Sequence, residues 1–211
     1  KGTRTGLYFP GGDKTWSTFT TPAGMQSRTI SFWMYHCTET GDHYYKSKGG
    51  FMPSLFESIN GWKILLSCNT SLGQNGTTLN AVYAPNVVVA EAGQLKCDGN
   101  LVQTGVWRHH AMMLELQDLG GGNWKVRSIY YVNGRFVCAT DWFDRKGFQN
   151  YFSSQTAWLG SQSHSPLGDE SATGNRPLHA YLDEVRLFSR VLTAEEVFDE
   201  FERSRNSSRS C

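Results

Sequence analysis

The chain has 211 residues, of which 39% are hydrophobic and 13% aromatic, and its formal net charge is +1. Nearly balanced charge without a long basic run argues against nucleic acid or an anionic membrane as partner, because both require clustered Lys and Arg. No stretch reaches the roughly 20 apolar residues that span a bilayer, so we expect no membrane insertion. The chain lacks a starting Met and a signal-like apolar segment, and we therefore expect it to be a piece of a larger protein.

Short apolar or alternating runs separated by turn residues predict β-strands along most of the chain. These runs cover residues 6–10, 28–36, 53–59, 61–68, 78–84, 86–92, 106–116, 123–132, 135–142 and 156–162. In the run 28–36 the apolar residues Ile30, Phe32 and Met34 alternate with an amphipathic and aromatic set, Ser31, Trp33 and Tyr35, which indicates a strand covered on both faces. Asn133-Gly134 predicts a type I′ hairpin turn, because these residues accept positive φ angles. Gly120 to Gly122 predict a turn that links the strands on either side of them. Residues 161–179 have almost no apolar content, which predicts a long surface loop.

One helix is predicted near the C-terminus. Thr193 and Glu196 have the spacing of a capping box, and Leu192 and Val197 that of a hydrophobic staple. The apolar stripe expected on this helix consists of Val197, Phe198 and Phe201. Many strands followed by one helix, without alternation of strands and helices, predict an all-β fold: an antiparallel two-sheet β-sandwich (jelly roll) with one short C-terminal helix.

The strand predicted directly before this helix contains two adjacent acidic residues. Strict alternation would place Asp183 on one face and Glu184 on the other, each among apolar neighbours. Since one face should be buried, at least one of these carboxylates must be satisfied by something other than bulk water. The partner is either hydrogen-bonding protein groups or a bound ion.

The five cysteines show no metal-ligand spacing, and the first four, Cys37, Cys68, Cys97 and Cys138, are disulfide candidates. The first four allow three connectivities; our preferred pairs are Cys68 with Cys97 and Cys37 with Cys138, while Cys211 is free or bonded to a missing part of the protein. The alternative is that all five are reduced. Three sequons, at Asn69, Asn75 and Asn206, are candidate N-glycosylation sites. Together with the cysteines they favour a secreted or cell-surface location.

Several separated motifs resemble those of laminin-G-like, or concanavalin A-like, jelly-roll domains of the lectin and glucanase superfamily. In chain order they are LYFPGGDKTW, ISFWMY, VWRHHAMMLEL, IYYVNGRFV and YLDEVRLFSRVLTAEEV, which extend from about residue 7 to residue 198. The segment from about residue 40 to residue 100 has no counterpart in that pattern. The resemblance implies a single laminin-G-like domain over residues 1–203, followed by a polar tail or linker at 204–211.

The resemblance also implies a calcium site, because members of the family often bind this ion near the edge of the sandwich. The corresponding positions are Asp183 in the closing strand and Asp13 in the N-terminal Gly-rich turn, with carbonyl groups around Gly11 and Gly12 as further ligands. Calcium takes six to eight oxygen ligands, so two carboxylates would need carbonyls and water to complete the site. Its expected role is structural. Alternatively, Asp183 accepts hydrogen bonds from backbone amides or pairs with an arginine.

The candidate ligand-binding residues are aromatic side chains suited to stacking on sugars and polar side chains suited to hydrogen-bonding their hydroxyls. They are Trp142, Phe143, Phe148 and Tyr151 in one segment, and Asp169, Asn175 and Arg176 in the predicted loop. The alternative is that the aromatics cap the core and that the loop is merely solvated. His109 and His110 are not expected to share a metal ion, since adjacent strand residues point to opposite faces.

Catalysis is not expected, because glycoside hydrolysis needs two carboxylates about 5 to 9 Å apart and no run supplies a suitably spaced pair. Nor is there a recognisable nucleophile, phosphate-binding or metalloprotease motif. The sequence therefore predicts a non-catalytic extracellular recognition or adhesion module that binds a glycan or a protein, with calcium as a possible structural ion. The alternatives are an architectural domain without a small ligand, or an accessory domain of a glycoside hydrolase.

Overall fold

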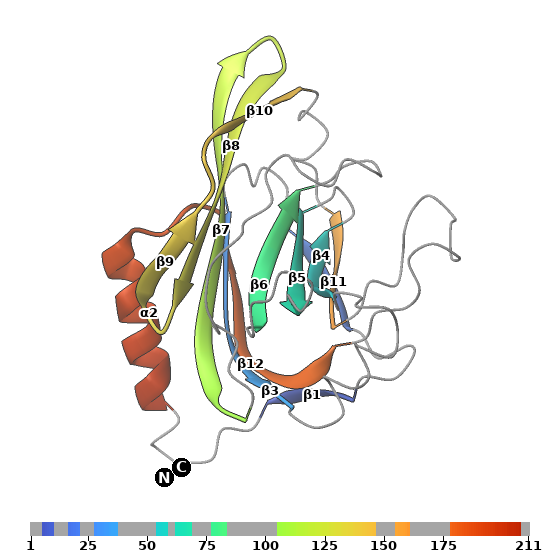
Figure 1. The fold of residues 1–211 in the computed structure, drawn as a ribbon, viewed down its shortest axis with the longest axis vertical. Helices are drawn as coiled ribbons and strands as arrows, with labels where there is room; N and C mark the ends of the chain where they lie inside the picture. The colour runs from blue at the N-terminus through green and yellow to red at the C-terminus, as the bar shows by residue number, and fades with distance from the viewer. Residues whose placement is uncertain are drawn as a thin grey trace, which may run out of the picture.

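The computed structural model describes residues 6–10, 17–21, 28–37, 54–58, 62–68, 77–83, 105–146, 155–160 and 178–207. These residues form two antiparallel β-sheets and one helix (Figure 1). The predicted strand at 86–92 and most of the predicted loop 161–179 lie outside the described residues.

The larger sheet has seven strands, in the order β1-β12-β3-β7-β8-β10, with β9 also paired to β8. Their bounds are β1 (Leu7–Pro10), β12 (His179–Phe188), β3 (Arg28–His36), β7 (Trp107–Gly120), β8 (Asn123–Val132), β9 (Arg135–Ala139) and β10 (Phe143–Lys146). Strands β7 and β8 form a long hairpin that extends beyond the rest of the sandwich, at the top of Figure 1. The larger sheet therefore contains strands from the N-terminal, central and C-terminal parts of the chain.

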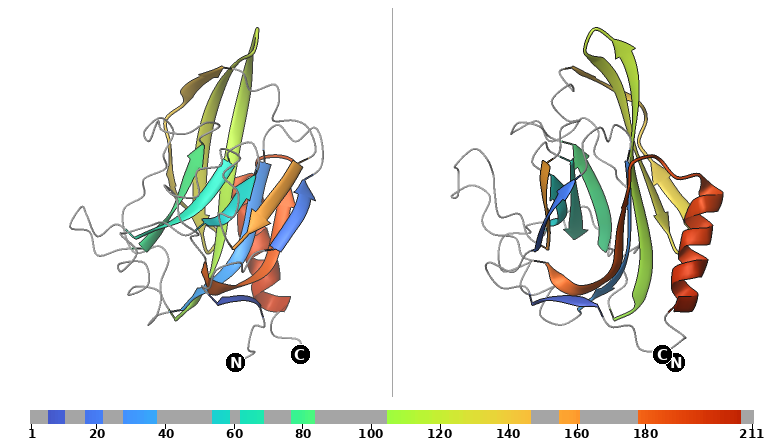
Figure 2. Two further views of the ribbon diagram at one scale, coloured as in Figure 1. Left: turned by 90° about the vertical axis from the view of Figure 1, so that its right-hand side faces the viewer. Right: turned by 180° about the vertical axis from the view of Figure 1, so that it is seen from behind.

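The smaller sheet has five strands, in the order β2-β11-β4-β5-β6. Their bounds are β2 (Ser17–Thr21), β11 (Gln155–Leu159), β4 (Ser54–Ser58), β5 (Trp62–Cys68) and β6 (Thr77–Tyr83). It lies across one face of the larger sheet, as both views in Figure 2 show. The architecture confirms the predicted antiparallel jelly-roll sandwich.

Strand β3 shows why the sandwich forms as it does. Ile30, Phe32 and Met34 point into the space between the sheets, where all three are almost fully buried. The alternate residue Trp33 points to the outer face of the larger sheet and is buried there as well. A strand that is apolar on both faces suits the middle of a sheet that has a second layer on each side. The expectation for residues 28–36 is confirmed.

Helix α2 (Ala194–Ser207) supplies the layer on the outer face of the larger sheet (Figure 2). Its predicted capping box is present: the Thr193 amide donates to Glu196 Oε2 at 2.8 Å, and the Glu196 amide donates to Thr193 Oγ1 at 3.2 Å. Leu192 and Val197 are both buried against this face. Arg190 also hydrogen-bonds Glu196 and, with the Thr193 amide, lowers the pKa of its carboxyl to about 2.

The structure differs from the sequence predictions in a few local details. Phe198 does not join the buried stripe of α2, since 47% of its surface is exposed. The helix continues to Ser207, so residues 204–207 of the predicted tail are helical, and Ser204 is buried. Strands β2 and β10 carry weak apolar patterns and were not predicted. The type I′ turn at Asn133-Gly134 is confirmed by positive φ angles of 49° and 75°.

Candidate functional site

Trp142 lies just before β10 and is the most exposed of the predicted ligand-binding aromatics for which the structure gives an exposure, with 37% of its surface accessible. The Arg127 guanidinium lies over its indole ring, 4.7 Å from the centroid. Arg127 is held in turn by Glu115, its partner across β7 and β8, at 2.5 Å. A cation above an indole ring is an attractive contact that also restricts the orientation of the ring. Trp142, Arg127 and Glu115 thus form an ordered exposed surface, which we name the Trp142 surface.

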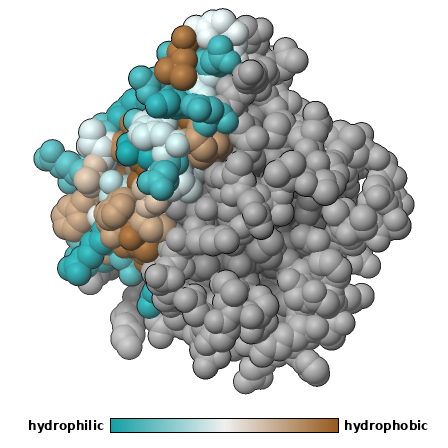
Figure 3. Space-filling view, turned by 45° about the horizontal axis from the view of Figure 1, so that its top comes forward, coloured by the Kyte–Doolittle hydropathy of each residue, from teal (hydrophilic) through white to brown (hydrophobic). Residues whose placement is uncertain are grey.

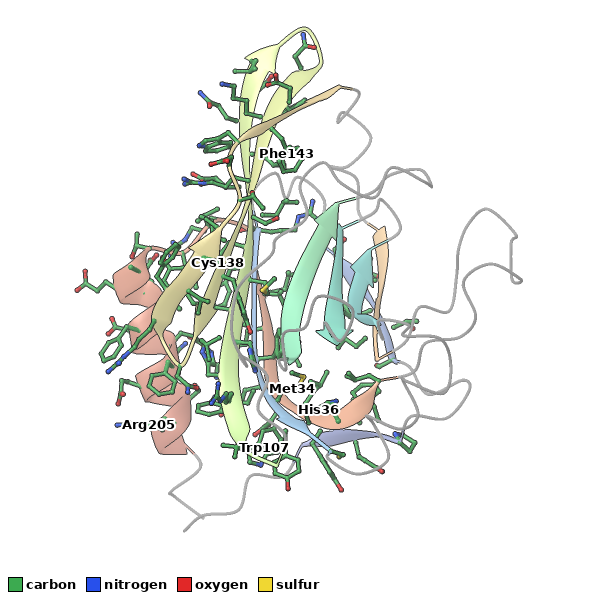
Figure 4. The ribbon with its side chains drawn as sticks, in the orientation of Figure 1. Met34, His36, Trp107, Cys138, Phe143 and Arg205 are labelled. Atoms are coloured by element: carbon green, nitrogen blue, oxygen red, sulfur yellow. The ribbon has the colours of Figure 1, made fainter. Side chains whose placement is uncertain are left out.

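Phe143, the next residue, does not belong to the Trp142 surface. It is partly buried and packs against the core between the sheets, as expected for adjacent residues in extended backbone. Figure 4 labels it on β10. The other predicted ligand-binding residues, namely Phe148, Tyr151, Asp169, Asn175 and Arg176, lie outside the described residues.

Strand β12 contains a β-bulge that resolves the problem of the two adjacent acids. Before the bulge Asp183 pairs with Trp33, and after it Arg186 pairs with Ser31, so β12 has one residue more than β3. Glu184 occupies the bulge with a φ of 48°. The strict alternation predicted for this strand is therefore wrong: Tyr181 and Asp183 lie on the outer face, whereas the later odd-numbered residues, Val185 and Leu187, pack against the core.

Both carboxylates are satisfied by protein groups. Asp183 accepts a hydrogen bond from the Glu184 amide at 2.8 Å. Glu184 forms an ion pair with Arg186 at 2.8 Å, and Arg186 also pairs with Glu200 of helix α2. Glu200 is 5% exposed and is paired with Arg203 as well. The bulge thus directs acidic groups to the outer face, where arginines bind the strand to the helix.

The described residues do not by themselves form a calcium site. Asp183 is the one predicted ligand among them, whereas Asp13 lies outside. Within the described part of the chain, no group of three or more His, Cys, Asp or Glu side chains is arranged to hold a metal ion. Since calcium requires six to eight oxygen ligands, Asp183 alone does not suffice, and the Asp13–Asp183 site stays a prediction.

The cysteines also differ from the preferred pairing. Cys138 is bonded in a disulfide, whereas Cys37 has a free thiol, so the pair Cys37–Cys138 is wrong. The topology gives the reason. Cys37 follows β3, and Cys138 is on β9, three strand spacings away across β7 and β8. That is roughly 14 Å, too far for a disulfide bond. Among the sequons, Asn206 lies in the last turn of α2, and Asn69 and Asn75 are outside the described residues.

The two adjacent histidines point to opposite faces, as predicted. His109 contacts Trp33 and Phe201 on the outer face, with ring centroids 5.5 Å and 5.9 Å away. His110 lies in the core, where it stacks on Phe32 and hydrogen-bonds the Tyr130 hydroxyl at 2.7 Å. Burial, aided by the charges of His109 and Arg108, holds the pKa of His110 well below its usual value. The pair has no geometry for binding one ion.

Buried His110 makes folding stability depend on pH. In the unfolded chain the imidazole takes up a proton near pH 6.5, but in the folded protein it stays neutral to much lower pH. Below about pH 6.5 the free energy of unfolding should therefore fall, by up to about 1.4 kcal/mol per pH unit for this group. Urea unfolding at about pH 7.5 and about pH 5 measures the slope. His110→Gln should flatten it; an unchanged slope would assign the effect to other groups.

Sequence analysis did not reveal a second aromatic surface, formed by Tyr8, Tyr35, Trp107 and Tyr181. The register pairs Tyr8 with Tyr181, Tyr181 with Tyr35 and Tyr35 with Trp107, so one ring row crosses four neighbouring strands. Tyr8 and Tyr181 are 44% and 36% exposed, and the other two are half-buried. We name these four residues the aromatic row. No local signal in the sequence shows that four such separated residues meet.

The two aromatic surfaces lie at opposite ends of the outer face, on either side of helix α2. Trp107 marks the lower end and Phe143, next to Trp142, the upper end in Figure 4. Figure 3 shows the described part of the top as separate hydrophobic patches among hydrophilic residues. Among the described residues, no helix has the length and apolar character needed to cross a membrane. Helix α2 therefore covers the middle of the outer face, and the two aromatic surfaces lie beyond it (Figure 4).

Over residues 10–198 the sequence matches the family described as the concanavalin A-like lectin/glucanases superfamily. The chain belongs to this superfamily, as its motifs predicted. No curated protein matches the sequence closely enough to identify a relative.

Several solved structures are similar to this chain, and the two with TM-scores above 0.5 share its fold. The carbohydrate-binding module CBM40 of the Ruminococcus gnavus IT-sialidase, bound to α2,3-sialyllactose, has a TM-score of 0.53 and 14% identity, covering 94% of this chain and 97% of that chain. The complex of the same module with α2,6-sialyllactose has a TM-score of 0.52 and 14% identity, covering 93% of this chain and 96% of that chain. The botulinum neurotoxin type G receptor-binding domain has a TM-score of 0.48 and 12% identity. The match covers 94% of this chain but only 46% of that chain. These low identities establish the fold alone.

Proposed function

We propose that this chain is a non-catalytic recognition module that binds a glycan through exposed aromatic side chains. The observation that carries the proposal is the Trp142 surface, on a fold shared with carbohydrate-binding modules. An indole ring offers an apolar face to the CH groups of a sugar, while neighbouring charged groups can bind its hydroxyls. Arg127 and Glu115 are in position to do this, since both side chains are about one-third exposed.

We also propose that the module works outside the cell, as a part of a larger protein. The sequons and the disulfide-bonded Cys138 support this location. Calcium bound by Asp13 and Asp183 is proposed as a structural ion, with no part in the recognition itself. An extracellular protein partner is the other candidate ligand, and an architectural role without a small ligand is the alternative function.

Replacing Trp142 with alanine should weaken glycan binding roughly tenfold or more without unfolding the protein, because the ring is exposed. A glycan array that includes both sialyllactoses would identify ligands, and titration calorimetry would compare the variants. The matched control is Phe136→Ala on β9, which removes another exposed aromatic, 59% accessible, from the same sheet. If no glycan binds the parent protein, the proposed function is wrong; binding that survives W142A would remove the Trp142 surface from it.

A further inference from the structure

The aromatic row has a geometry set by the backbone of four strands. The four strands together span roughly 14 Å, but the rings gather more closely, because Trp107 lies 6.5 Å from Tyr181 and its Cη2 atom approaches Gly6, just before β1. Tyr8 and Tyr181 are stacked, with centroids 4.5 Å apart, whereas Tyr35 is nearly perpendicular to Tyr181, at 76° and 6.0 Å. Trp107 completes the row, 5.7 Å from Tyr35. The surface thus combines stacked and perpendicular rings with three phenolic hydroxyls.

The row is held in place by close packing around Trp107 and beside Tyr35. A Cβ atom on Gly6 would lie 2.9 Å from Cη2 of Trp107 and 2.7 Å from the Leu182 carbonyl oxygen. The indole therefore lies tightly against the backbone at the start of β1. Trp33, two residues before Tyr35 on the same face, is fixed under helix α2 by a hydrogen bond to Ser204. A ligand would meet rings whose positions are already ordered, which reduces the entropy cost of binding.

The row itself carries no charge. Its members are tyrosines and a tryptophan, and desolvation, with Cys37 and Tyr181 nearby, keeps the pKa of Tyr8 above its usual value. Among the described residues next along these strands on the same face, Asp183 is charged, and it already accepts a backbone hydrogen bond. An anionic ligand would lose hydration here without gaining an opposite charge, and the three phenolic hydroxyls favour a hydroxyl-rich partner over a cation. The complementary ligand is neutral and amphipathic, with CH surface for the rings and hydroxyls for the phenols.

We propose that the aromatic row binds a neutral, unbranched oligosaccharide laid across strands β1, β12, β3 and β7. The proposal rests on the proposed glycan-binding function and adds a second subsite to it, distinct from the Trp142 surface. Pyranose rings present CH-rich faces to the aromatic rings, and their hydroxyls pair with those of Tyr8, Tyr35 and Tyr181. Because several rings contribute, an oligosaccharide should bind more tightly than a single sugar.

The test uses maltohexaose, cellohexaose and chitohexaose as probes, with saturation-transfer NMR and calorimetry on the whole chain. Tyr181→Ala and Tyr8→Ala remove exposed rings, and Tyr181→Phe removes one hydroxyl while keeping the ring. We expect roughly tenfold weaker binding of at least one hexasaccharide to Y181A, and a smaller loss for Y181F. F136A, which lies outside both aromatic surfaces, should leave this binding unchanged. Near-UV circular dichroism confirms that each variant is folded.

The outcomes separate the subsite from the function as a whole. If glycans bind the parent protein and are lost in W142A but not in Y8A or Y181A, the aromatic row proposal is overturned while the proposed function stands. If the parent binds none of the hexasaccharides and no array glycan, both are overturned. A proline-rich peptide that binds the row while the hexasaccharides do not would also overturn the proposal, since such peptides dock on aromatic grooves too.

Discussion

Replacing Gly160 with alanine is expected to destabilise the protein by about 3 to 5 kcal/mol. Gly160 follows β11, and Phe9 of β1 packs directly on its Cα. An added Cβ would lie 2.1 Å from Cδ1 and 2.2 Å from Cε1 of Phe9, whose ring is almost fully buried. The residue also has a φ of 89°, which strains any side chain. The contact joins the edge strand of one sheet to the other sheet, so a shift of Phe9 would open the core.

Gly120→Ala is the matched control, because Gly120 has a similar φ of 81° but no atom within 4 Å of an added Cβ. Urea unfolding of both variants separates backbone strain from the steric clash. G120A should lower the free energy of unfolding by about 1 to 2 kcal/mol, and G160A should lower it by clearly more. In the double variant Phe9→Ala/Gly160→Ala, the cost should be smaller than the sum of the two single changes. Equal losses for G120A and G160A would show that the Phe9 ring moves freely, contrary to the packing described.

Replacing Trp33 with alanine is expected to cost about 3 to 5 kcal/mol and to loosen one half of helix α2. The indole is 5% exposed, stacks on Phe201 at 5.7 Å and donates a hydrogen bond to Ser204 at 2.9 Å. It also packs edge-on against His109. The contacts with Phe201 and Ser204 involve the second half of the helix, while the capping box and Val197 hold the first half. Amide hydrogen exchange should therefore accelerate mainly after residue 200.

Trp33→Phe separates packing from hydrogen bonding in the same place. Phenylalanine keeps a ring against Phe201 but cannot donate to Ser204, so the expected cost is nearer about 1 to 2 kcal/mol. Ser204 retains its own hydrogen bond to the Phe201 carbonyl, at 3.0 Å, and is not left unsatisfied. If exchange in residues 200–207 is as slow in W33A as in the parent, Trp33 does not hold the second half of the helix, contrary to the packing described.

Local patterns were enough to predict most of the described strands and the position at which helix α2 begins. The Asn133-Gly134 turn and the Thr193–Glu196 capping box depend on residues within four positions of one another, so their chemistry is visible in the sequence. Alternation in residues 28–36 likewise identified a strand buried on both sides. The family motifs then fixed how these elements are connected.

What could not be predicted depends on pairing between distant strands. The aromatic row exists because register aligns residues as far apart as Tyr8 and Tyr181. Trp142 and Phe143 looked like one cluster, but the backbone sends them to opposite sides. The preferred Cys37–Cys138 bond failed because two intervening strands separate the residues. Strand β10 was not predicted because its sequence, Phe-Asp-Arg-Lys, has little apolar character. It forms a strand because it pairs with β8.

The bulge at Glu184 has a consequence for how this segment can change in evolution or engineering. Downstream of it, every side chain of β12 has its face determined by the presence of one additional residue. If Glu184 were drawn into regular pairing, Arg186 would turn toward the core and Leu187 toward helix α2, because the side-chain period of a strand is two. Deleting Glu184 would instead remove the bulge and leave both side chains on their present faces. The second half of β12 therefore tolerates the loss of this one residue, whereas loss of the bulge without a deletion would exchange its two faces at once.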